Sequence, residues 1–436
     1  MSKMKILIIA DEVWSDTIHG NNVLSNWFSG FEAEFAEIYC SPGTPKNNCC
    51  ENYFQITDSM MAKSFFGKKA GRAFHITVPA MQNESVINNA EQIPTSFYRF
   101  MKSITGEGLR IVRDLIWLYG IYDKKGLQKF IDDFQPDIVF CPRLLTPKLL
   151  RLERIVANMT NTPFVAFTAD DEVSLMQVSY SPLYWIRRLL FRSAFKKHVR
   201  LYKHYFMFSE EQAKDYYRNY KILTSTLFKS GNFESQPAVK LVNNPLKLVY
   251  AGRLYCNRWK TLAAIGDALK TMNANGTKIT LDIYTQEDVT SKQLQALSPN
   301  NYLRLNKAVT SSELQEIYRN ADIALHVESF DKKYRYATRV SFSTKIIDLM
   351  ASTCAIMAIC WDKHAGFQYL KKHDAAFCVS NYDEIKITLQ KIVENSDLIT
   401  EFSRTAWSCG TENHTSKIIH KDIYTVFKKI IFQNKT

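Results

Sequence analysis

Glycine is scarce in this sequence, which has 15 glycines among 436 residues. The fingerprint GxGxxG, whose glycines let a backbone approach the phosphates of a dinucleotide, is absent. The sequence therefore does not indicate dinucleotide binding through a glycine-rich loop.

Cysteine and histidine spacings that hold metals are missing too. The nine cysteines are scattered, odd in number and never spaced as CxxC, and the nine histidines show no HxxxH or HExxH. Neither a zinc site nor a disulfide framework is indicated. We therefore expect reduced thiols, no bound metal and a cytoplasmic setting.

Long apolar runs are also absent. A membrane-spanning helix needs about 18 or more consecutive apolar residues, and no such run occurs. The first residues, MSKMKILIIADEV, have too short an apolar run for a signal peptide and no cleavage site. Neither a secretory leader nor a transmembrane helix is expected.

What the chain does have is length and positive charge. A chain of 436 residues exceeds one ordinary core, so two domains are expected. Hydrophobic residues at 46% and charged residues at 23% are typical of a soluble globular protein. The net charge of +13 predicts an acidic partner: nucleic acid, an anionic lipid or a phosphorylated ligand.

The first half alternates apolar strand patterns with helical ones. Residues 4–10 predict a buried strand, followed by a loop with Gly20 and Asn21 that opens a helix. Residues 163–168 (PFVAFT) predict another strand, which ends at Asp170 and Asp171. Acidic residues just beyond a strand lie where open α/β sheets place ligands, although either aspartate could instead cap the next helix.

Two helical segments of the first half differ in character. Residues 109–119 are strongly apolar and predict a buried helix. Residues 183–206 predict a basic amphipathic helix that has no acidic residue as far as Lys203. Its basic stripe consists of Arg188, Arg192, Lys196, Arg200 and Lys203. Two interpretations are open: a helix lying on an anionic membrane surface, or a helix packed on the core with a solvated basic face.

The strand–helix rhythm restarts in the second half. The polar segment 231–244 has a proline and no periodicity, which indicates a linker. The expected organisation is a first domain over 1–235, a linker at 236–245, a second domain over 246–412 and a last helix over 413–436. The predicted fold class is α/β, with two facing Rossmann-like domains and a cleft between them.

The segment 341–359 (SFSTKIIDLMASTCAIMAI) of the second half has the features of an anion site. Ser343 and Thr344 are expected to cap a helix, and Lys345 lies in its first turn. Asp348 follows one turn later on the same face. Backbone amides and a lysine suit a diphosphate, and a carboxylate suits ribose hydroxyls.

Three further residues follow strands of the same predicted sheet. Arg253 comes after the strand 246–250, Lys260 starts the next helix, and Glu328 follows the strand 322–327. Strand ends of one parallel sheet converge on one edge, so these side chains could share a site with Lys345. Three cations would balance the negative charge of a diphosphate without a metal ion. Each also has an ordinary structural interpretation, such as an ion pair between Arg253 and Glu328.

Two segments, YAGRLYCNRWKTLAAIGDAL and SFSTKIIDLMAS, resemble the donor-binding half of bacterial glycosyltransferases of family 4. KILIIADEV and VAFTADD resemble the acceptor half of that family. These enzymes have the GT-B fold of two Rossmann-like domains and retain the configuration of the transferred sugar. The resemblance implies transfer of a hexose-type sugar from a nucleotide-diphosphate donor to a lipid-linked or growing saccharide, as in lipopolysaccharide or capsule synthesis. It further implies a nucleotide sugar as donor substrate, no cofactor, and a location in the cytoplasm or at the inner face of the cytoplasmic membrane.

The resemblance also implies roles for individual residues. Arg253 and Lys260, as catalytic residues, would hold the diphosphate. Ser343, Thr344 and Lys345 would support the phosphates and the sugar. Asp348 would bond the ribose, in the place of the family's second glutamate. Val340 stands where the first glutamate is expected, and Thr353 and Ala355 where glycine and proline are common.

The remaining roles concern Glu328 and the first domain. Glu328 would belong to the donor site. Gly20 and Asn21 would approach the acceptor. Asp170, as a catalytic residue, and Asp171 would orient the donor sugar or the acceptor in the place of the family's histidine.

Two other functions are compatible with the sequence. One is a nucleotide-sugar epimerase of the same architecture, although no acid–base pair is clearly placed for it. The other is a non-catalytic binder of nucleic acid or a membrane surface through the basic segment. No recognised nucleic-acid module is present, so no nucleic-acid partner is expected.

Overall fold

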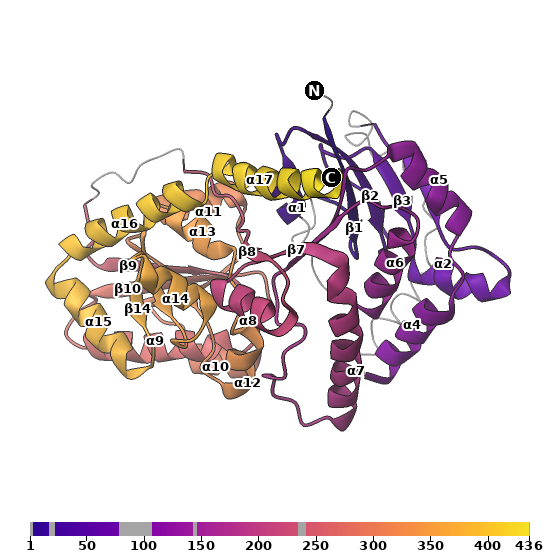
Figure 1. The fold of residues 1–436 in the computed structure, drawn as a ribbon. Helices are drawn as coiled ribbons and strands as arrows, with labels where there is room; N and C mark the ends of the chain where they lie inside the picture. The colour runs from indigo at the N-terminus through magenta and orange to yellow at the C-terminus, as the bar shows by residue number, and fades with distance from the viewer. Residues whose placement is uncertain (1–2, 17–21, 78–106, 143–145, 234–240, 436) are drawn as a thin grey trace. The chain divides into compact units, whose positions relative to one another are not determined.

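The computed structural model describes residues 3–16, 22–77, 107–142, 146–233 and 241–435, which form two compact units (Figure 1). Unit 1 comprises Met1–Ser174, Ser179–Leu227 and His420–Thr436. Unit 2 comprises Leu175–Val178 and Phe228–Ile419. The expected linker overlaps residues 234–240, which lie outside the described residues, so its bounds stay a prediction.

Unit 1 is built on an eight-stranded sheet in the order β4-β3-β2-β1-β5-β6-β7-β8. Neighbouring strands pair in parallel, except that β3 and β4 are antiparallel. The strands are β1 Met4–Ala10, β2 Ala33–Tyr39, β3 Asn52–Gln55, β4 Arg72–His75, β5 Ile138–Pro142, β6 Phe164–Thr168, β7 Tyr202–Met207 and β8 Thr224–Thr226. Central strands such as β5 and β6 are buried along their whole length, which explains their continuous apolar sequences.

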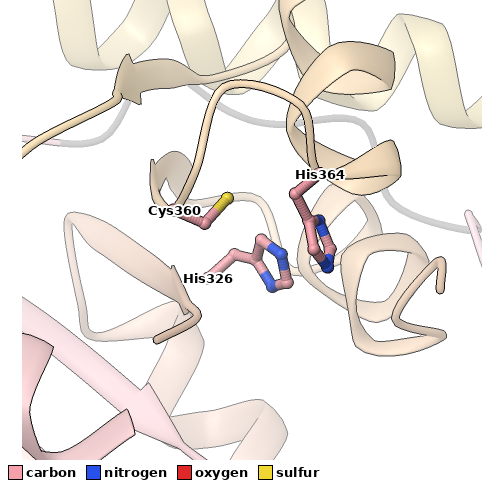
Figure 2. A group of neighbouring side chains, drawn as sticks. All are labelled: His326, Cys360 and His364. Carbon is pink, nitrogen blue, oxygen red and sulfur yellow. The ribbon is translucent and has the colours of Figure 1, made fainter. Parts of the chain in front are cut away.

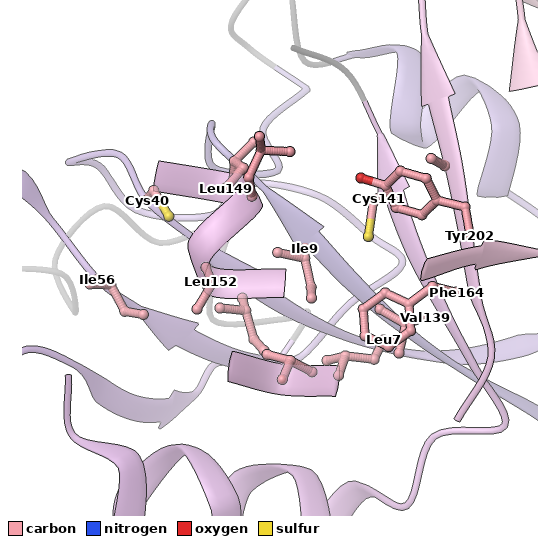
Figure 3. Packing of buried hydrophobic residues seen from close by; sticks show 14 of the residues in the cluster. Leu7, Ile9, Cys40, Ile56, Val139, Cys141, Leu149, Leu152, Phe164 and Tyr202 are labelled. Carbon is pink, nitrogen blue, oxygen red and sulfur yellow. The ribbon is translucent and has the colours of Figure 1, made fainter. Parts of the chain in front are cut away.

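The helices of unit 1 are α1 Asn22–Phe28, α2 Asp58–Lys63, η1 Ser64–Phe66, α4 Glu107–Tyr119, α5 Lys124–Phe134, α6 Pro147–Ala157, α7 Pro182–His198, η4 Val199–Leu201 and α8 Glu210–Tyr220. Hydroxyl side chains begin several of them. Thr146 and Ser181 each accept a hydrogen bond from the third amide of α6 and α7 respectively. Figure 3 shows side chains of α6 packed over the sheet, where Leu149 and Leu152 lie in one core with Leu7, Ile9 and Val139.

Helix α4 is not the buried helix that its apolar sequence predicts. Trp117 is buried, but Leu115, Leu118 and Tyr119 are exposed. The prediction of burial is wrong because only one stripe of α4 faces the core, and the remaining apolar residues point to solvent.

The last helix, α17 Ser416–Lys435, contributes its residues from His420 onward to unit 1. The ring of Phe427 lies 5.6 Å from Phe140 and 6.4 Å from Phe206, measured between ring centroids. His420 packs edge-on against Phe31 at 5.4 Å. The end of the chain therefore completes an aromatic cluster on the sheet of unit 1.

Unit 2 is built on a six-stranded, entirely parallel sheet in the order β11-β10-β9-β12-β13-β14. The strands are β9 Leu246–Ala251, β10 Ile279–Thr285, β11 Leu303–Lys307, β12 Ile323–Val327, β13 Ala355–Ile359 and β14 Phe377–Val379. The helices that begin and end within unit 2 are α9 Arg258–Met272, α10 Ser291–Leu297, α11 Ser311–Arg319, α12 Lys332–Thr338, α13 Lys345–Ala351, α14 Ala365–Lys372, α15 Asp383–Glu394 and α16 Asp397–Asn413.

Numbered along the chain, the strand order of unit 2 is 3-2-1-4-5-6, which is that of a Rossmann domain. Unit 1 has the same order at its centre, with two further strands at its edges. The expected α/β class with two Rossmann-like domains is confirmed. In such sheets ligands bind beyond the carboxyl ends of the two strands at which the order reverses, here β9 and β12 in unit 2.

Candidate functional site

A buried ion pair lies beyond the carboxyl ends of β9 and β12. Arg258, the first residue of α9, donates from Nε and Nη2 to Glu328 at 3.0 and 2.6 Å. Both side chains are mostly buried, with 13% and 6% of their surface exposed. Burial alone would raise the pKa of Glu328, but the charge and hydrogen bonds of Arg258, together with the nearby His364 and His326, outweigh burial and lower the pKa. Glu328 is thus held ionised against Arg258, not against Arg253.

Lys260 is also paired. Its Nζ lies 2.8 Å from Oδ2 of Asp331, which accepts a second hydrogen bond from the Asn257 side chain at 2.6 Å. These two donors lower the pKa of Asp331 against the opposing effect of burial. The pair is partly exposed, so a stronger anion could draw Lys260 away from Asp331.

Lys345, at the start of α13, reaches the end of β9. Its Nζ donates to the carbonyl oxygen of Ala251 at 3.2 Å. A Cβ atom at Gly252 would come 2.4 Å from this Nζ, so a side chain there would displace the lysine. Although part of Lys345 is exposed, the desolvation of its ammonium among protein groups and the charges of Arg258 and Arg253 together lower its pKa to about 8.

Arg253, in the loop after β9, has an exposed side chain. Its backbone carbonyl accepts a hydrogen bond from the Tyr250 hydroxyl at 2.7 Å, which fixes the loop after β9. The Gln286 amide, with its oxygen toward Arg253, accepts from Nε at 3.0 Å. The charges of Arg258 and Arg253 both lower the pKa of Lys345, and we call these three residues the cationic cluster. This cluster can hold a polyanion.

The start of α13 differs from the expected capped helix. Thr344 has helical backbone angles, φ −57° and ψ −23°, and its hydroxyl caps no amide. The capping prediction is wrong because a capping residue needs extended angles to turn its side chain toward the helix. At the other end of α13, Thr353 has φ +65°, where a β-branched residue is strained and the resembling family has glycine.

Asp348 carries a partner that the sequence did not predict. Lys229 donates to its two carboxylate oxygens at 3.0 and 3.3 Å. The carboxylate keeps about half of its surface exposed. It therefore remains accessible to a hydroxyl group of a ligand.

A second cluster, of two histidines and a cysteine, was not predicted from sequence spacing, and one of its histidines belongs to β12. Figure 2 shows His326, in β12, beside Cys360 and His364. Their nearest ligand-type atoms lie within 4.8 Å of one another, and all three side chains are buried. Burial lowers the pKa of His326 to about 3, and Nε2 of this residue has no hydrogen-bond partner among the described residues. The spacing of Cys360 and His364, four residues apart, was the available signal.

Two imidazoles and a thiol are donors that zinc or copper prefer. His364, however, already uses Nδ1 to accept the amide of Gly366 at 3.2 Å, as the cap of α14. In the neutral ring of His364, Nε2 then carries the proton. The residue therefore has no free lone pair for a metal unless it gives up its hydrogen bond to the Gly366 amide. The cluster as it stands is a buried packing element, and the absence of a metal stays a prediction.

In unit 1, the two aspartates after β6 have different surroundings. Asp171 accepts the amide of Ser174 at 3.0 Å and lies 3.4 Å from Nη2 of Arg188, so it shapes the loop. Asp170 is exposed and borders a cavity of about 770 Å³. Gly20 and Asn21 lie outside the described residues.

Helix α7 does not present the predicted basic stripe along its whole length. Nε of Arg188 donates to the Ser174 carbonyl at 2.6 Å, and Arg192 donates to the Val173 carbonyl at 2.6 Å. Arg187 pairs with Asp114 of α4 at 3.2 Å. The stripe prediction is wrong for Arg188 and Arg192, because they bond carbonyls of the preceding loop. In the described part of the chain, no helix is long and apolar enough to cross a bilayer.

Comparison with known proteins shows what the fold is. No family model and no curated protein sequence matches the chain. Solved structures match it over nearly its whole length. HepE of Anabaena in complex with UDP has a TM-score of 0.62 at 12% identity, covering 98% of this chain and 100% of that chain.

Two other solved structures give the same result. Sucrose-phosphate synthase of Thermosynechococcus elongatus has a TM-score of 0.62 at 10% identity, covering 99% of this chain and 100% of its own. The E. coli trehalose-6-phosphate synthase bound with UDP-2-fluoro glucose has a TM-score of 0.61 at 10% identity, covering 97% and 99%. At such identities the likeness establishes the fold alone. The chain has two parallel-sheet α/β domains of the GT-B kind.

Proposed function

We propose that the protein is a glycosyltransferase that moves a hexose-type sugar from a nucleotide-diphosphate donor to a lipid-linked or growing cell-surface saccharide, with retention, as in family 4. The observation that carries this proposal is the cationic cluster at the carboxyl ends of β9 and β12. Solved structures of the same fold contain UDP or a UDP-sugar, which supports a nucleotide sugar as donor.

The donor diphosphate would be held by Arg253, Lys260 and Lys345. Lys345 is the best placed of these, since its ammonium lies among protein groups and has only the Ala251 carbonyl as its acceptor within the described residues. Lys260 would exchange Asp331 for a phosphate oxygen. A diphosphate carries more negative charge than one carboxylate, so it attracts the ammonium more strongly.

Other residues would complete the donor site. The Ser343 and Thr344 hydroxyls would support the phosphates and the sugar, and Asp348 would bond the ribose. Glu328 is engaged on both oxygens by Arg258. It would therefore act as a positioning residue, holding the Arg258 charge near the phosphates.

The acceptor would belong to unit 1. Asp170 is proposed to orient its hydroxyl group, whereas Asp171 acts through the loop that it stabilises. Gly20 and Asn21 are proposed acceptor contacts. A location at the inner face of the cytoplasmic membrane would bring the protein to such an acceptor.

The chemistry would be mainly electrostatic. As the diphosphate departs, negative charge grows on its oxygens, and Arg253, Lys260 and Lys345 stabilise that charge. The acceptor hydroxyl attacks the anomeric carbon from the same face, and the departing phosphate oxygen takes its proton. The bond from carbon to phosphate oxygen breaks as the new glycosidic bond forms, and no resident metal is called for.

Ligand binding tests this proposal directly. A thermal-shift screen with UDP, GDP, ADP and their glucose conjugates is expected to raise the melting temperature with one nucleotide, because the ligand binds only the folded state. The solved structures of the same fold favour UDP. If none of the six ligands raised the melting temperature at millimolar concentration, the proposed donor site would be wrong.

The pH dependence of binding is expected to report on Lys345. Its pKa is about 8 in the free protein, and a bound diphosphate would raise it by opposite charge. Binding should then take up a proton above pH 8, and affinity should fall as the pH rises from 8 to 9.5. The diphosphate itself does not change its protonation in this range, because its last pKa is about 6.

Calorimetric titrations at both pH values, in two buffers of different ionisation enthalpy, measure this proton uptake. Lys345→Met is expected to bind more weakly and to lose the uptake. Equal pH dependence in both proteins would contradict the assignment of the proton to Lys345.

A further inference from the structure

Unit 1 contains a cavity of about 770 Å³ between α4, α6 and α7. This volume is typical of sites that bind small organic molecules. One end is bordered by Asp170 and Asp171, just beyond the carboxyl end of β6. The walls along α4 and α7 are mainly apolar side chains, chiefly Leu115, Leu118, Leu183, Ile186 and Leu190.

These walls are unusually apolar for a surface. The described residues include 24 exposed large apolar side chains, and eight of them lie in the 30 residues of α4 and α7. In α7, Leu183, Ile186 and Leu190 are three and four residues apart, so they form one stripe. A contiguous apolar patch of this kind marks a place where something apolar binds.

The arginines of α7 explain how this face comes to be exposed. Arg188 and Arg192 bond the carbonyls of Ser174 and Val173, and Arg187 bonds Asp114. The first half of the helix is therefore fixed with these three arginines toward the protein and its leucines toward solvent. That orientation leaves apolar surface in water, which is unfavourable unless a ligand covers it.

The charges around the patch indicate the kind of ligand. The C-terminal half of α7 and the residues that follow expose Lys196, Lys197, Arg200 and Lys203, with no acidic residue among them. Basic residues next to an apolar face attract the anionic headgroups of lipids. A free saccharide would gain little from leucine walls, and a cavity ending at aspartates needs a ligand with a polar end.

The geometry points to a site for an amphiphile: its hydrocarbon chain lies against α4 and α7, and its hydroxyl-bearing head reaches Asp170. This inference rests on the proposed function, in which Asp170 orients the acceptor. It selects a lipid-linked acceptor over a soluble growing saccharide.

The test uses the full chain and the fluorescent probe 11-(dansylamino)undecanoic acid, whose emission increases in an apolar site. Saturable binding is expected. Farnesyl phosphate or lysophosphatidylglycerol should displace the probe, and the more effective of the two identifies an isoprenoid or an acyl chain as the source. Maltose, which has no hydrocarbon, should not displace it.

Matched variants locate the site. Leu115→Gln combined with Leu190→Gln is expected to weaken probe binding at least tenfold, since both side chains line the cavity. Neither is buried, so the fold should survive. Ile387→Gln is the control, because Ile387 is as exposed as Leu190, at 68%, but lies on α15 of unit 2. Equal binding by both variants, or probe emission that never saturates, would overturn the inference.

Nucleotide binding separates this inference from the proposed function. The cavity variant should keep the thermal shift that the wild-type protein shows with its nucleotide. A shift with nucleotide but no probe binding would overturn the lipid site and leave the donor site intact. Probe binding without any nucleotide shift would overturn the acceptor role, because a lipid site without a donor does not make an acceptor site.

Discussion

Replacing Lys345 by methionine is expected to lower the turnover number roughly 10²- to 10³-fold, which is about 3–4 kcal/mol of transition-state stabilisation. The reason is the position of its ammonium: it lies at the end of β9, beside the charges of Arg253 and Arg258. A charge in such surroundings interacts strongly with negative charge that develops nearby. Methionine has a similar length and leaves no cavity. The measurement is the rate of nucleotide release from the nucleotide sugar that gives the largest thermal shift.

Lys391→Met is the matched control. Lys391 is an exposed lysine near the end of α15 in the same unit. Its replacement should leave turnover and the melting temperature unchanged. Wild-type turnover in the Lys345→Met protein would show that the leaving diphosphate is not stabilised at this place.

Replacing Arg258 by methionine is expected to destabilise unit 2 by about 3–5 kcal/mol, since it leaves a buried carboxylate without its partner. The double variant Arg258→Met with Glu328→Gln should recover most of that loss, because no buried charge remains. The pH dependence has a definite sign. The pKa of Glu328 is lowered in the folded state, so its contribution is present above the ordinary pKa near 4.5 and disappears as the pH falls below it.

An exposed pair in the same sheet provides the comparison. Arg304 contacts Asp282 with two hydrogen bonds of 2.6 Å, the same kind of geometry, but half of the arginine is exposed. Arg304→Met should cost no more than about 1 kcal/mol. Urea unfolding followed through the transition of unit 2 measures all of these proteins. Similar losses for Arg258→Met and Arg304→Met would contradict the role assigned to burial.

Much of unit 2 could be predicted from local sequence. The pattern 246–250 is β9 with one residue more, and the helix expected to start at Lys260 is α9, which begins two residues earlier at Arg258. Each of these elements is decided by its own apolar spacing. The convergence of strand ends then follows from parallel topology, which is why Arg253 and Lys345 could be placed together.

The partners of the charged residues could not be predicted in this way. Arg258 and Glu328 are 70 residues apart, and Lys229 and Asp348 are 119 apart. Their pairing depends on how loops approach one another, which no periodicity records. The orientation of α7 could not be predicted for a related reason. Arg188 and Arg192 are held by backbone carbonyls of a loop, and because every residue has such a carbonyl, the sequence does not mark the partner. A basic stripe in a sequence therefore does not say which way it faces.

The split of unit 1 along the chain has a consequence for synthesis on the ribosome. The other segments of unit 1 end at Leu227, but the aromatic cluster on its sheet needs Phe427, which is translated 200 residues later. At about 5–20 residues per second, that interval is roughly 10–40 seconds. During this time Phe140 and Phe206 lack their final cover, while the long segment of unit 2, Phe228–Ile419, is made. The nascent chain thus exposes this apolar surface until its last helix is made, and unit 2 can finish folding before unit 1 does.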